Sequence, residues 1–392
     1  MRINKKEPRH WVYLLLFTVH ILCASIARII NKNRTPRTII LYGHKLNGNL
    51  YAIYNYIKNN PSTGLGVAYM TMDVKYAREL KAQGVNVFSC ISLRDMLIAC
   101  QSSIYVTDHG PHALIILKLF SDVKFIDVWH GIPFKGFDEN DFKLLHLYNA
   151  VFVSSLAMQA KYIDQFGFRS DAVVITGYPR TDCLIKQEID TSGVLDDLGI
   201  KKTSYRAIIL LAPTWTHHRY GQAPDLMNMS EIQFLQQLCD AMKKRNILVI
   251  YRAHLNAAES DLPGLKNLIS CPLGKYENTE ALLSVSDILI SDWSSIVFDY
   301  LLLMRPTLFI DRENPFDNGF TFGPEYRFGP VTSSLDELVD AIDSSLDIKK
   351  YMTEWNKKMK EVKTKLYGEY ADGKSTKRSV NEILRFIQGA QS

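Results

Sequence analysis

The sequence has few cysteines and no cysteine motif. Its 392 residues include six cysteines, at positions 23, 90, 100, 183, 239 and 271, and no two of them form a C-x-x-C pair. This pattern argues against a structural zinc site or a disulfide framework, and it fits a reducing compartment. The chain also lacks repeats of solenoid period and low-complexity segments, so it is not a repeat array.

Net charge is also small. The formal charge is +5, with 47% hydrophobic and 22% charged residues, which is typical of a globular chain long enough for two domains. Such a charge favours anionic partners but gives no nucleic-acid signal, so we predict no nucleic-acid partner. Basic residues gather near the N-terminus, where Glu7 is the only acid among Arg2, Lys5, Lys6, Arg9, Arg28, Lys32, Arg34 and Arg37.

One apolar run, residues 11–27, lies between these basic residues and is interrupted only by Thr18, His20 and Ser25. A spanning helix needs about 20 apolar residues, so the run is borderline. No A-x-A cleavage site is evident and Arg28 follows directly, which argues against a cleaved signal peptide. We predict that residues 1–37 are a membrane-associated segment, spanning or embedded, with basic flanks against anionic lipid of the cytoplasmic face. The alternative is a buried amphipathic helix of the first domain.

From about residue 38 onward, apolar runs that end in polar or glycine-rich residues alternate with helical stretches. The runs are residues 38–42, 66–70, 104–106, 124–129, 150–153, 172–175, 207–212, 246–250, 288–290 and 307–310. Strands alternating with helices predict an α/β fold with parallel sheets covered on both faces. A polar stretch at about 190–205 indicates an interdomain link. We therefore expect two doubly wound domains, 38–190 and 191–392.

The stretch from 286 to 311 contains a strand, a hydroxyl-rich loop, a helix and a second strand. Ser291, Asp292, Ser294 and Ser295 follow the first strand, and all four are helix N-cap types. Backbone N–H groups and hydroxyls at a helix N-terminus suit a phosphate. An ordinary capped helix is the alternative interpretation.

Chemically distinctive residues lie just past the predicted strand ends. They are His130, Lys135, Gly177, Arg180, Thr214, Trp215, Arg252, His254, Asp292, Ser294 and Ser295. Ligands of open α/β sheets bind beyond that edge, so two facing domains would both contribute to a cleft. Cations and helix-terminal hydroxyls suit a diphosphate, and a histidine suits a general base.

Six short motifs support a resemblance to a known family. They are WHGIPFK (129–135), GYPRTD (177–182), LAPTW (211–215), RAH (252–254), SDWSSIVFD (291–299) and YADGK (370–374). In this order they resemble W-H-G-T-P-L-K, G-x-P-R-x-D, A-P-T-W-R, R-x-H-P, T-D-Y-S-S-x-x-F-D and F-x-D-G-x of the CDP-glycerol glycerophosphotransferases, the teichoic acid primases and polymerases. The resemblance covers about residues 38–387. The sequence departs from the family motifs at three residues, Ile132, Thr216 and Leu255. These departures concern the detailed phosphate contacts and the identity of the donor.

The resemblance implies a GT-B-like fold, with two Rossmann-like domains facing a cleft and attachment to the cytoplasmic face of the cell membrane. Residues 38–190 would form the acceptor-side domain, and residues 191–392 the donor-binding domain with the terminal helices. The implied reaction moves glycerol phosphate from CDP-glycerol, or a related CDP-polyol, to a hydroxyl of a lipid-linked saccharide or a teichoic-acid-like or capsular polymer, releasing CMP.

The same resemblance implies roles for individual residues. His130 would be the base and His254 the acid toward CMP, while Lys135 and Arg252 bear on the diphosphate. The remaining substrate-binding candidates are Gly177, Pro179, Arg180, Thr214, Trp215, Asp292, Ser294, Ser295 and Asp299. We expect no cofactor and no metal, because the acids of residues 138–141 fit an exposed loop.

Two other functions remain open from the sequence. A GT-B glycosyltransferase that uses a nucleotide sugar would have the same fold and cleft. A non-enzymatic, membrane-tethered module that binds polyanions would show no turnover, and its binding would weaken uniformly with salt.

Overall fold

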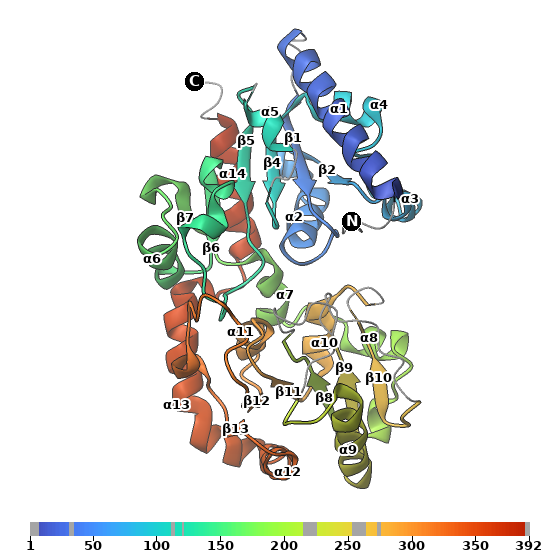
Figure 1. Ribbon diagram of the computed structural model, residues 1–392, viewed down its shortest axis with the longest axis vertical. Helices are drawn as coiled ribbons and strands as arrows, with labels where there is room; N and C mark the ends of the chain where they lie inside the picture. Colours follow the sequence, from blue (N-terminus) through green and yellow to red (C-terminus); the bar gives the residue numbers. More distant parts are fainter. Residues whose placement is uncertain are drawn as a thin grey trace. The chain divides into compact units, whose positions relative to one another are not determined.

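The chain folds into two compact units. The computed structural model describes residues 8–30, 35–110, 114–119, 121–214, 226–252, 264–272 and 276–388. The first unit comprises Met1–His130, Glu139–Asp182 and Lys374–Ser392, and the second comprises Gly131–Asp138 and Cys183–Gly373. Each unit is built on one parallel sheet with helices packed around it (Figure 1), which confirms the α/β prediction.

The first unit contains a seven-stranded parallel sheet in the order β3-β2-β1-β4-β5-β6-β7. Its strands are β1 (Thr35–Tyr42), β2 (Gly66–Thr71), β3 (Val87–Ser89), β4 (Ser102–Thr107), β5 (Lys124–Asp127), β6 (Ala150–Val153) and β7 (Val173–Ile175). Ile39, Leu41, Ile104 and Val106 are completely buried, because helices cover both faces of the sheet. The strand order reverses between β1 and β4, and ligands of such sheets bind at this switch point.

The helices of the first unit flank its sheet, and three of them begin at side-chain caps. The helices are α2 (Gly48–Asn59), α3 (Val74–Ala82), α4 (Leu93–Ala99), α5 (Ile115–Leu119), α6 (Leu156–Asp164) and α14 (Ser375–Gln388), besides the N-terminal α1 (Pro8–Ile30). Asp73, Ser92 and Ser155 each accept a hydrogen bond from a backbone N–H of the first turn of α3, α4 and α6. Asn47 at the start of α2 makes no such bond.

The second unit contains a six-stranded parallel sheet in the order β10-β9-β8-β11-β12-β13. Its strands are β8 (Ala207–Leu211), β9 (Ile247–Tyr251), β10 (Leu268–Ser270), β11 (Ile288–Ser291), β12 (Thr307–Ile310) and β13 (Val331–Thr332). Its helices are α8 (Thr191–Asp197), α9 (Glu231–Lys244), α10 (Thr279–Val285), α11 (Ile296–Leu301), α12 (Leu335–Ser345) and α13 (Ile348–Tyr367). The strand order again reverses once, here between β8 and β11. The two sheets thus repeat one doubly wound plan.

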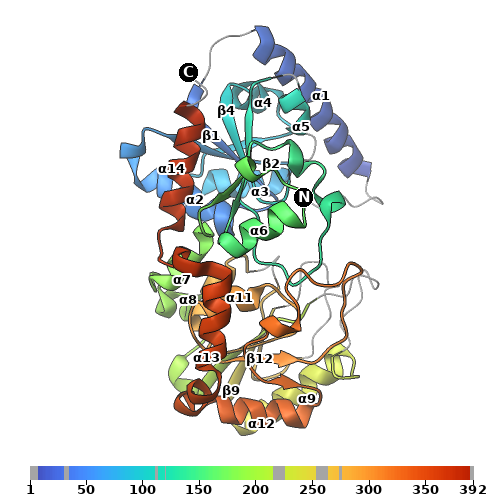
Figure 2. The ribbon, with the colours of Figure 1, turned by 90° about the vertical axis from the view of Figure 1, so that its left-hand side faces the viewer.

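The division of the chain differs from the expected one at two places. Residues 190–205, expected to link the domains, contain α8, which packs against α10 inside the second unit. The chain instead leaves the first unit at Asp182. Helix α14, expected in the second domain, lies along α2 in the first unit (Figure 2), where Val380 and Ile383 join the core.

Helix α1 contains the apolar run found in the sequence, and it is long and apolar enough to cross a membrane. It packs against α4 and α5 of the first unit. Phe17, Ile21, Ala24 and Arg28 are buried there. Only 28% of its most apolar 18-residue window is buried, so most of the helix surface faces away from the protein.

Candidate active site

His130 lies at the end of a strained turn beside the switch point of the first sheet. Strand β5 ends at Asp127, and Trp129 then adopts φ +46°, a left-handed conformation that costs a non-glycine residue about 1–2 kcal/mol. The buried Asp127 carboxylate accepts a hydrogen bond from the Trp129 N–H at 2.8 Å and another from the Thr107 hydroxyl at 2.7 Å. Burial raises the pKa of Asp127 to about 7.

Asn49, in the first turn of α2, holds the same turn from the other side. Its amide donates to the carbonyls of Val128 at 3.0 Å and Trp129 at 2.7 Å. Its side-chain oxygen accepts from the Arg180 N–H at 3.0 Å. One buried amide thus connects the turn that carries His130 to the segment that carries Arg180.

The hydrogen bond of the His130 ring determines its tautomer. Nδ1 of His130 lies 3.0 Å from the carbonyl oxygen of Asp108. A carbonyl only accepts, so Nδ1 carries the proton and Nε2 keeps a lone pair. The surrounding protein, and then His109, lower the pKa of His130 to about 3, although part of the side chain remains exposed. The ring is therefore neutral near pH 7, with Nε2 able to accept a proton.

His109 and His44 extend this group of imidazoles at the ends of β4 and β1. The ring of His109 stacks on that of His130, with centroids 4.5 Å apart, and the edge of His44 meets His109 at 5.5 Å. Nδ1 of His109 lies 2.8 Å from a carboxylate oxygen of Asp108. Burial lowers the pKa of His109, but the Asp108 carboxylate raises it more, so the net shift is upward.

The segment from Gly177 to Asp182 converges on the same place. Gly177 has φ +76°, and a Cβ there would lie 2.2 Å from Oγ of Ser375, so no side chain fits. Pro179 is buried at the start of a 3₁₀ turn (Pro179–Thr181), and Nη1 of Arg180 donates to the carbonyl of His130 at 2.5 Å. The Asp182 carboxylate accepts from the N–H groups of Ser375 and Thr376 and thereby fixes the start of α14.

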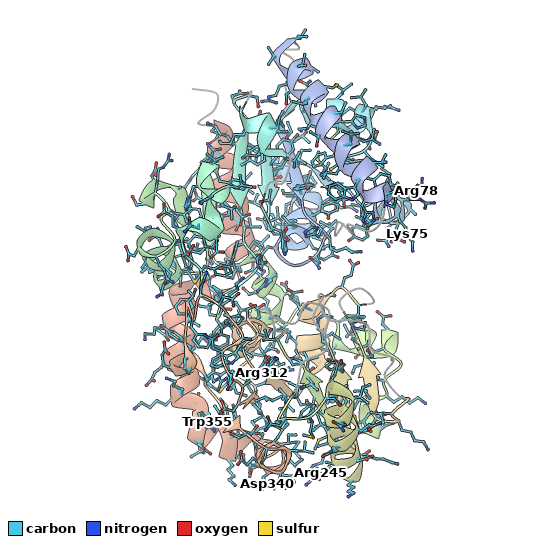
Figure 3. All side chains as sticks on the ribbon, in the orientation of Figure 1. Lys75, Arg78, Arg245, Arg312, Asp340 and Trp355 are labelled. Carbon is cyan, nitrogen blue, oxygen red and sulfur yellow. The ribbon has the colours of Figure 1, made fainter. Side chains whose placement is uncertain are left out.

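In the second unit, two predicted residues, Thr214 and Asp292, lie at the switch point between β8 and β11. The completely buried Asp292 accepts from the Thr214 N–H at 2.6 Å and pairs with Arg312 at 3.0 Å. Nη1 of Arg312, labelled in Figure 3, also donates to the Thr214 carbonyl at 2.8 Å. Asp292 therefore holds two strand ends together through both of its oxygens.

Hydroxyl groups line the same switch point. Ser295 stands before α11 but makes no capping hydrogen bond, and Ser294 beside it is half-buried. The buried Thr214 hydroxyl has no hydrogen-bond partner among the residues that the structure describes. Strand ends of both β8 and β11 thus present hydroxyls, as the sequence predicted for β11.

The loop that follows His130 belongs to the second unit. Thr321 donates to the carbonyl of Phe134 at 2.9 Å through its N–H and to that of Lys135 at 2.7 Å through its hydroxyl. The ring of Phe134 packs against Phe298 at 4.5 Å. The Lys135 ammonium lies over the ring of Phe137 at 4.9 Å. The main chain of Lys135 is therefore fixed within this unit.

Two predicted substrate contacts, Arg252 and Asp299, have partners within the protein. Arg252 donates to the carbonyl of Tyr276 at 2.8 Å and to the hydroxyl of Thr279 at 2.7 Å, and burial lowers its pKa to about 10. The buried Asp299 accepts from the Tyr367 hydroxyl at 3.3 Å, beneath α13. Trp215 and His254 lie outside the described residues.

The sequence matches a family of known proteins. The family model described as CDP-Glycerol:Poly(glycerophosphate) glycerophosphotransferase matches residues 24–385. The chain belongs to this family. It is 28% identical over 315 residues to the teichoic acid ribitol-phosphate polymerase TarK of Staphylococcus aureus, covering 72% of this chain and 56% of TarK. It is 24% identical to a teichoic acid poly(glycerol phosphate) polymerase of Bacillus spizizenii, covering 87% of this chain and 90% of the relative.

The fold of this family member also matches a solved structure. The wall teichoic acid polymerase TagF superposes with a TM-score of 0.76 at 18% identity, covering 98% of this chain and 100% of that one. A variant of TagF was also solved after soaking with CDPG. The chain spans about half the length of TarK and of two further polymerases that it matches. The likeness to TagF confirms a GT-B-like fold; the expected cleft stays a prediction.

The sequence analysis of this family member did not identify several residues that surround His130. They lie outside the matched motifs and are Asn49, Asp108, His109, His44 and Asp127. All of them except Asn49, which lies in the first turn of α2, stand at or near a predicted strand end. The signal that could have identified them is the switch-point rule, applied to strands β1 and β4. No group of three or more potential metal ligands occurs among the described residues.

Proposed function

We propose that this chain transfers glycerol phosphate from CDP-glycerol to a hydroxyl of a membrane-associated acceptor and releases CMP. The acceptor is a lipid-linked saccharide or a growing teichoic-acid-like or capsular polymer. The observation that carries the proposal is the neutral His130, whose Nδ1–H is held by Asp108 while Nε2 keeps its lone pair. Family membership and the hydroxyls at the second switch point support the choice of a nucleotide-linked polyol phosphate as donor.

In the proposed reaction, the acceptor oxygen attacks the phosphorus that carries glycerol. The new oxygen–phosphorus bond forms while the phosphoanhydride bond to CMP breaks, and Nε2 of His130 takes the acceptor's proton. Phosphoryl transfer depends chiefly on positioning and charge neutralisation. We assign donor phosphate to Ser294, Ser295, Thr214, Lys135 and Arg252, and nucleotide contact to Trp215 and Asp299. His254 serves as the acid toward CMP.

The remaining residues position these groups. Gly177 and Pro179 shape the segment that brings Arg180 to the carbonyl of His130. Asp292 joins Thr214 to Arg312 at the donor side. The protein acts at the cytoplasmic face of the membrane, to which α1 attaches it.

The decisive experiment supplies the purified full chain with CDP-glycerol, CDP-ribitol or a nucleotide sugar, together with a membrane lipid extract. CMP release and the mass of the product are measured. We expect turnover with CDP-glycerol, and the match to TarK makes CDP-ribitol the necessary comparison. Turnover of the nucleotide sugar alone would establish a glycosyltransferase instead. No turnover with any donor, with salt-sensitive polyanion binding, would establish a binding module.

A further inference from the structure

Two histidine rings lie side by side at the switch point of the first sheet. Both turn Nδ1 toward Asp108: that of His109 lies 2.8 Å from a carboxylate oxygen, and that of His130 lies 3.0 Å from the main-chain carbonyl. Their planes are 5° apart and their centroids 4.5 Å apart. Because Nδ1 and Nε2 occupy different edges of an imidazole, both Nε2 atoms face away from Asp108, on one side of the pair. The proposed reaction uses only one of these two edges, that of His130.

The Nε2 edge of His109 is open to a ligand. The side chain is 41% exposed, and its Nε2 makes no hydrogen bond to any residue that the structure describes. The surrounding protein lowers the pKa of His109, but the carboxylate of Asp108 raises it more, so the net shift is upward. The ring is therefore favoured as an imidazolium, in which both nitrogens are donors. Its outer edge thus presents a charged N–H to solvent.

Two further basic side chains lie beside the pair. The ring of His44, at the end of β1, meets the ring of His109 edge-on, with centroids 5.5 Å apart and 63° between the planes. Nη1 of Arg180 donates to the main-chain carbonyl of His130 at 2.5 Å. Both side chains are half-buried, so each keeps part of its surface in contact with solvent. The exposed edges of the pair therefore lie among basic groups.

The acids nearest to the pair face protein groups. The side chain of Asp108 is 7% exposed and contacts His109. Asp127 is completely buried and accepts hydrogen bonds from Thr107 and Trp129, and burial raises its pKa to about 7. An anion that approaches the exposed Nε2 edges therefore meets a charged N–H first.

We propose that His109, with His44 and Arg180 beside it, binds the phosphate of the acceptor's terminal unit, so that the preferred acceptor already ends in a polyol phosphate. His130 takes the proton of the terminal hydroxyl, while His109 contacts the phosphodiester that joins this unit to the rest of the acceptor. Only the short carbon chain of the polyol separates that hydroxyl from that phosphate, so the two groups can reach neighbouring Nε2 edges.

This inference rests on the proposed function and names its acceptor class. A cationic subsite next to the base favours extension of a chain that already carries polyol phosphate. An uncharged saccharide would leave the subsite empty, so it would be the poorer acceptor. The choice of donor is not affected.

Two soluble acceptors that differ by a single unit test the subsite. One is a disaccharide glycoside, and the other is the same glycoside extended by one glycerol phosphate. A hydrogen bond from a charged donor to a phosphate contributes about ten- to hundredfold to binding, so the wild type should use the extended acceptor with a kcat/KM at least about tenfold higher. Equal use of both, or preference for the uncharged one, would overturn the proposal.

The ratio of the two kcat/KM values identifies the residues. His109→Gln keeps a hydrogen-bonding side chain without the charge and should lower this ratio about tenfold, and His44→Gln should lower it severalfold. Any change in His130 acts on both acceptors alike, so the ratio isolates the contact with phosphate. The matched control is Lys58→Gln, which removes an exposed cation from the last turn of α2 and should keep the wild-type ratio. An unchanged ratio in the His109→Gln protein would refute the assignment.

Binding measured without turnover separates this inference from the proposed function. Glycerophosphoglycerol, a phosphodiester of two glycerols, is titrated into the full chain with ¹⁵N-labelled histidine, and glycerol is the uncharged control. We expect the diester alone to shift the His109 ring signals, saturably, and His109→Gln to abolish its binding. If no donor is turned over, the proposed function fails while this result still establishes the anion subsite. Absence of diester binding to the wild type would refute the subsite itself.

Calorimetry with CDP-glycerol distinguishes acceptor phosphate from donor phosphate. The His109→Gln protein should bind CDP-glycerol with an affinity near that of the wild type, and its melting temperature shows whether it is folded. A tenfold loss of CDP-glycerol affinity with an unchanged acceptor ratio would assign His109 to the donor and overturn the proposal.

Discussion

The imidazole of His109 lies parallel to that of His130, with 4.5 Å between ring centroids and 5° between the planes. Asp108 binds both residues, through its carboxylate to Nδ1 of His109 and through its carbonyl to Nδ1 of His130. The pair therefore divides the charge: His109 is favoured as the cation and His130 as the neutral base.

Replacing the base should remove turnover. We expect His130→Ala to lower kcat by about 10²–10⁴-fold, the usual contribution of a positioned general base. Binding of CDP-glycerol, measured by calorimetry, and the melting temperature should stay near wild type. Retention of wild-type kcat would refute the assignment.

The charge of His109 should control the acid limb of the pH–rate profile. Because the pKa of His130 is lowered to about 3, the wild type should show no His130 limb near neutrality. His109→Phe keeps a stacked ring but removes the neighbouring positive charge, so the pKa of His130 rises and an acid limb moves to higher pH. NMR titration of the His130 ring is the direct measurement. A profile and titration identical to wild type would show that the two rings are not coupled.

The contact between Asp108 and His109 predicts how the stability of the protein depends on pH. Asp108 raises the folded-state pKa of His109, so this contribution is fully present below about pH 6.5 and is lost as the pH rises through the raised value. Replacing Asp108 by Asn should therefore cost more stability at pH 6 than at pH 9. Urea unfolding at both values tests this, and an equal cost would contradict it.

Asn49 should affect catalysis only by positioning the turn that carries His130. Asn49→Asp keeps the acceptor for the Arg180 N–H but removes the donors to Val128 and Trp129. Two buried carbonyls then lose a partner, at about 1–3 kcal/mol each. We expect kcat to fall with little change in KM for the donor, and Asn49→Asp to cost at least as much stability as Asn49→Ala, because its buried carboxylate faces two carbonyl oxygens. A purely structural role predicts lower stability with unchanged kcat in the folded fraction.

The donor side is tested at Ser294. A carboxylate there would repel donor phosphate, so Ser294→Asp should weaken CDP-glycerol binding at least tenfold, while Ser294→Ala should cost about 1.5–3 kcal/mol. The matched control is Ser334→Asp, because Ser334 caps α12 and Asp caps equally well. Wild-type affinity in the Ser294→Asp protein would move the donor site elsewhere.

Motifs and periodicity predicted much of this protein, for identifiable reasons. Strands β6 and β12 have the predicted bounds because both are buried apolar runs with polar residues at each end. The run at 124–129 was expected to be one strand, but it ends at Asp127, because Asp127 and Asn49 hold Trp129 in a left-handed turn. Strands β3, β10 and β13 have only two or three residues and give no periodic signal.

Site residues could be predicted from sequence where a chemically distinctive side chain stands in a recognisable motif. His130 and Arg180 stand in recognisable motifs, and the structure brings them together. Asn49 and His109 could not be assigned in the same way, because their roles come from contacts with residues more than 20 positions away. Arg252 and Asp299 stay predicted ligand contacts, and tertiary packing also gives their polar atoms partners within the protein.

The placement of α14 in the first unit has a consequence for biosynthesis. Its start is fixed by Asp182, 193 residues earlier in the chain, and Val380, Ile383 and Ile387 complete the core around β1 and β4. The first unit therefore stays unfinished on the ribosome while the whole second unit is made. Closing so distant a contact is slow and leaves apolar surface exposed meanwhile. A fragment that stops at residue 182 would keep that surface uncovered, so it is expected to aggregate rather than fold as a domain.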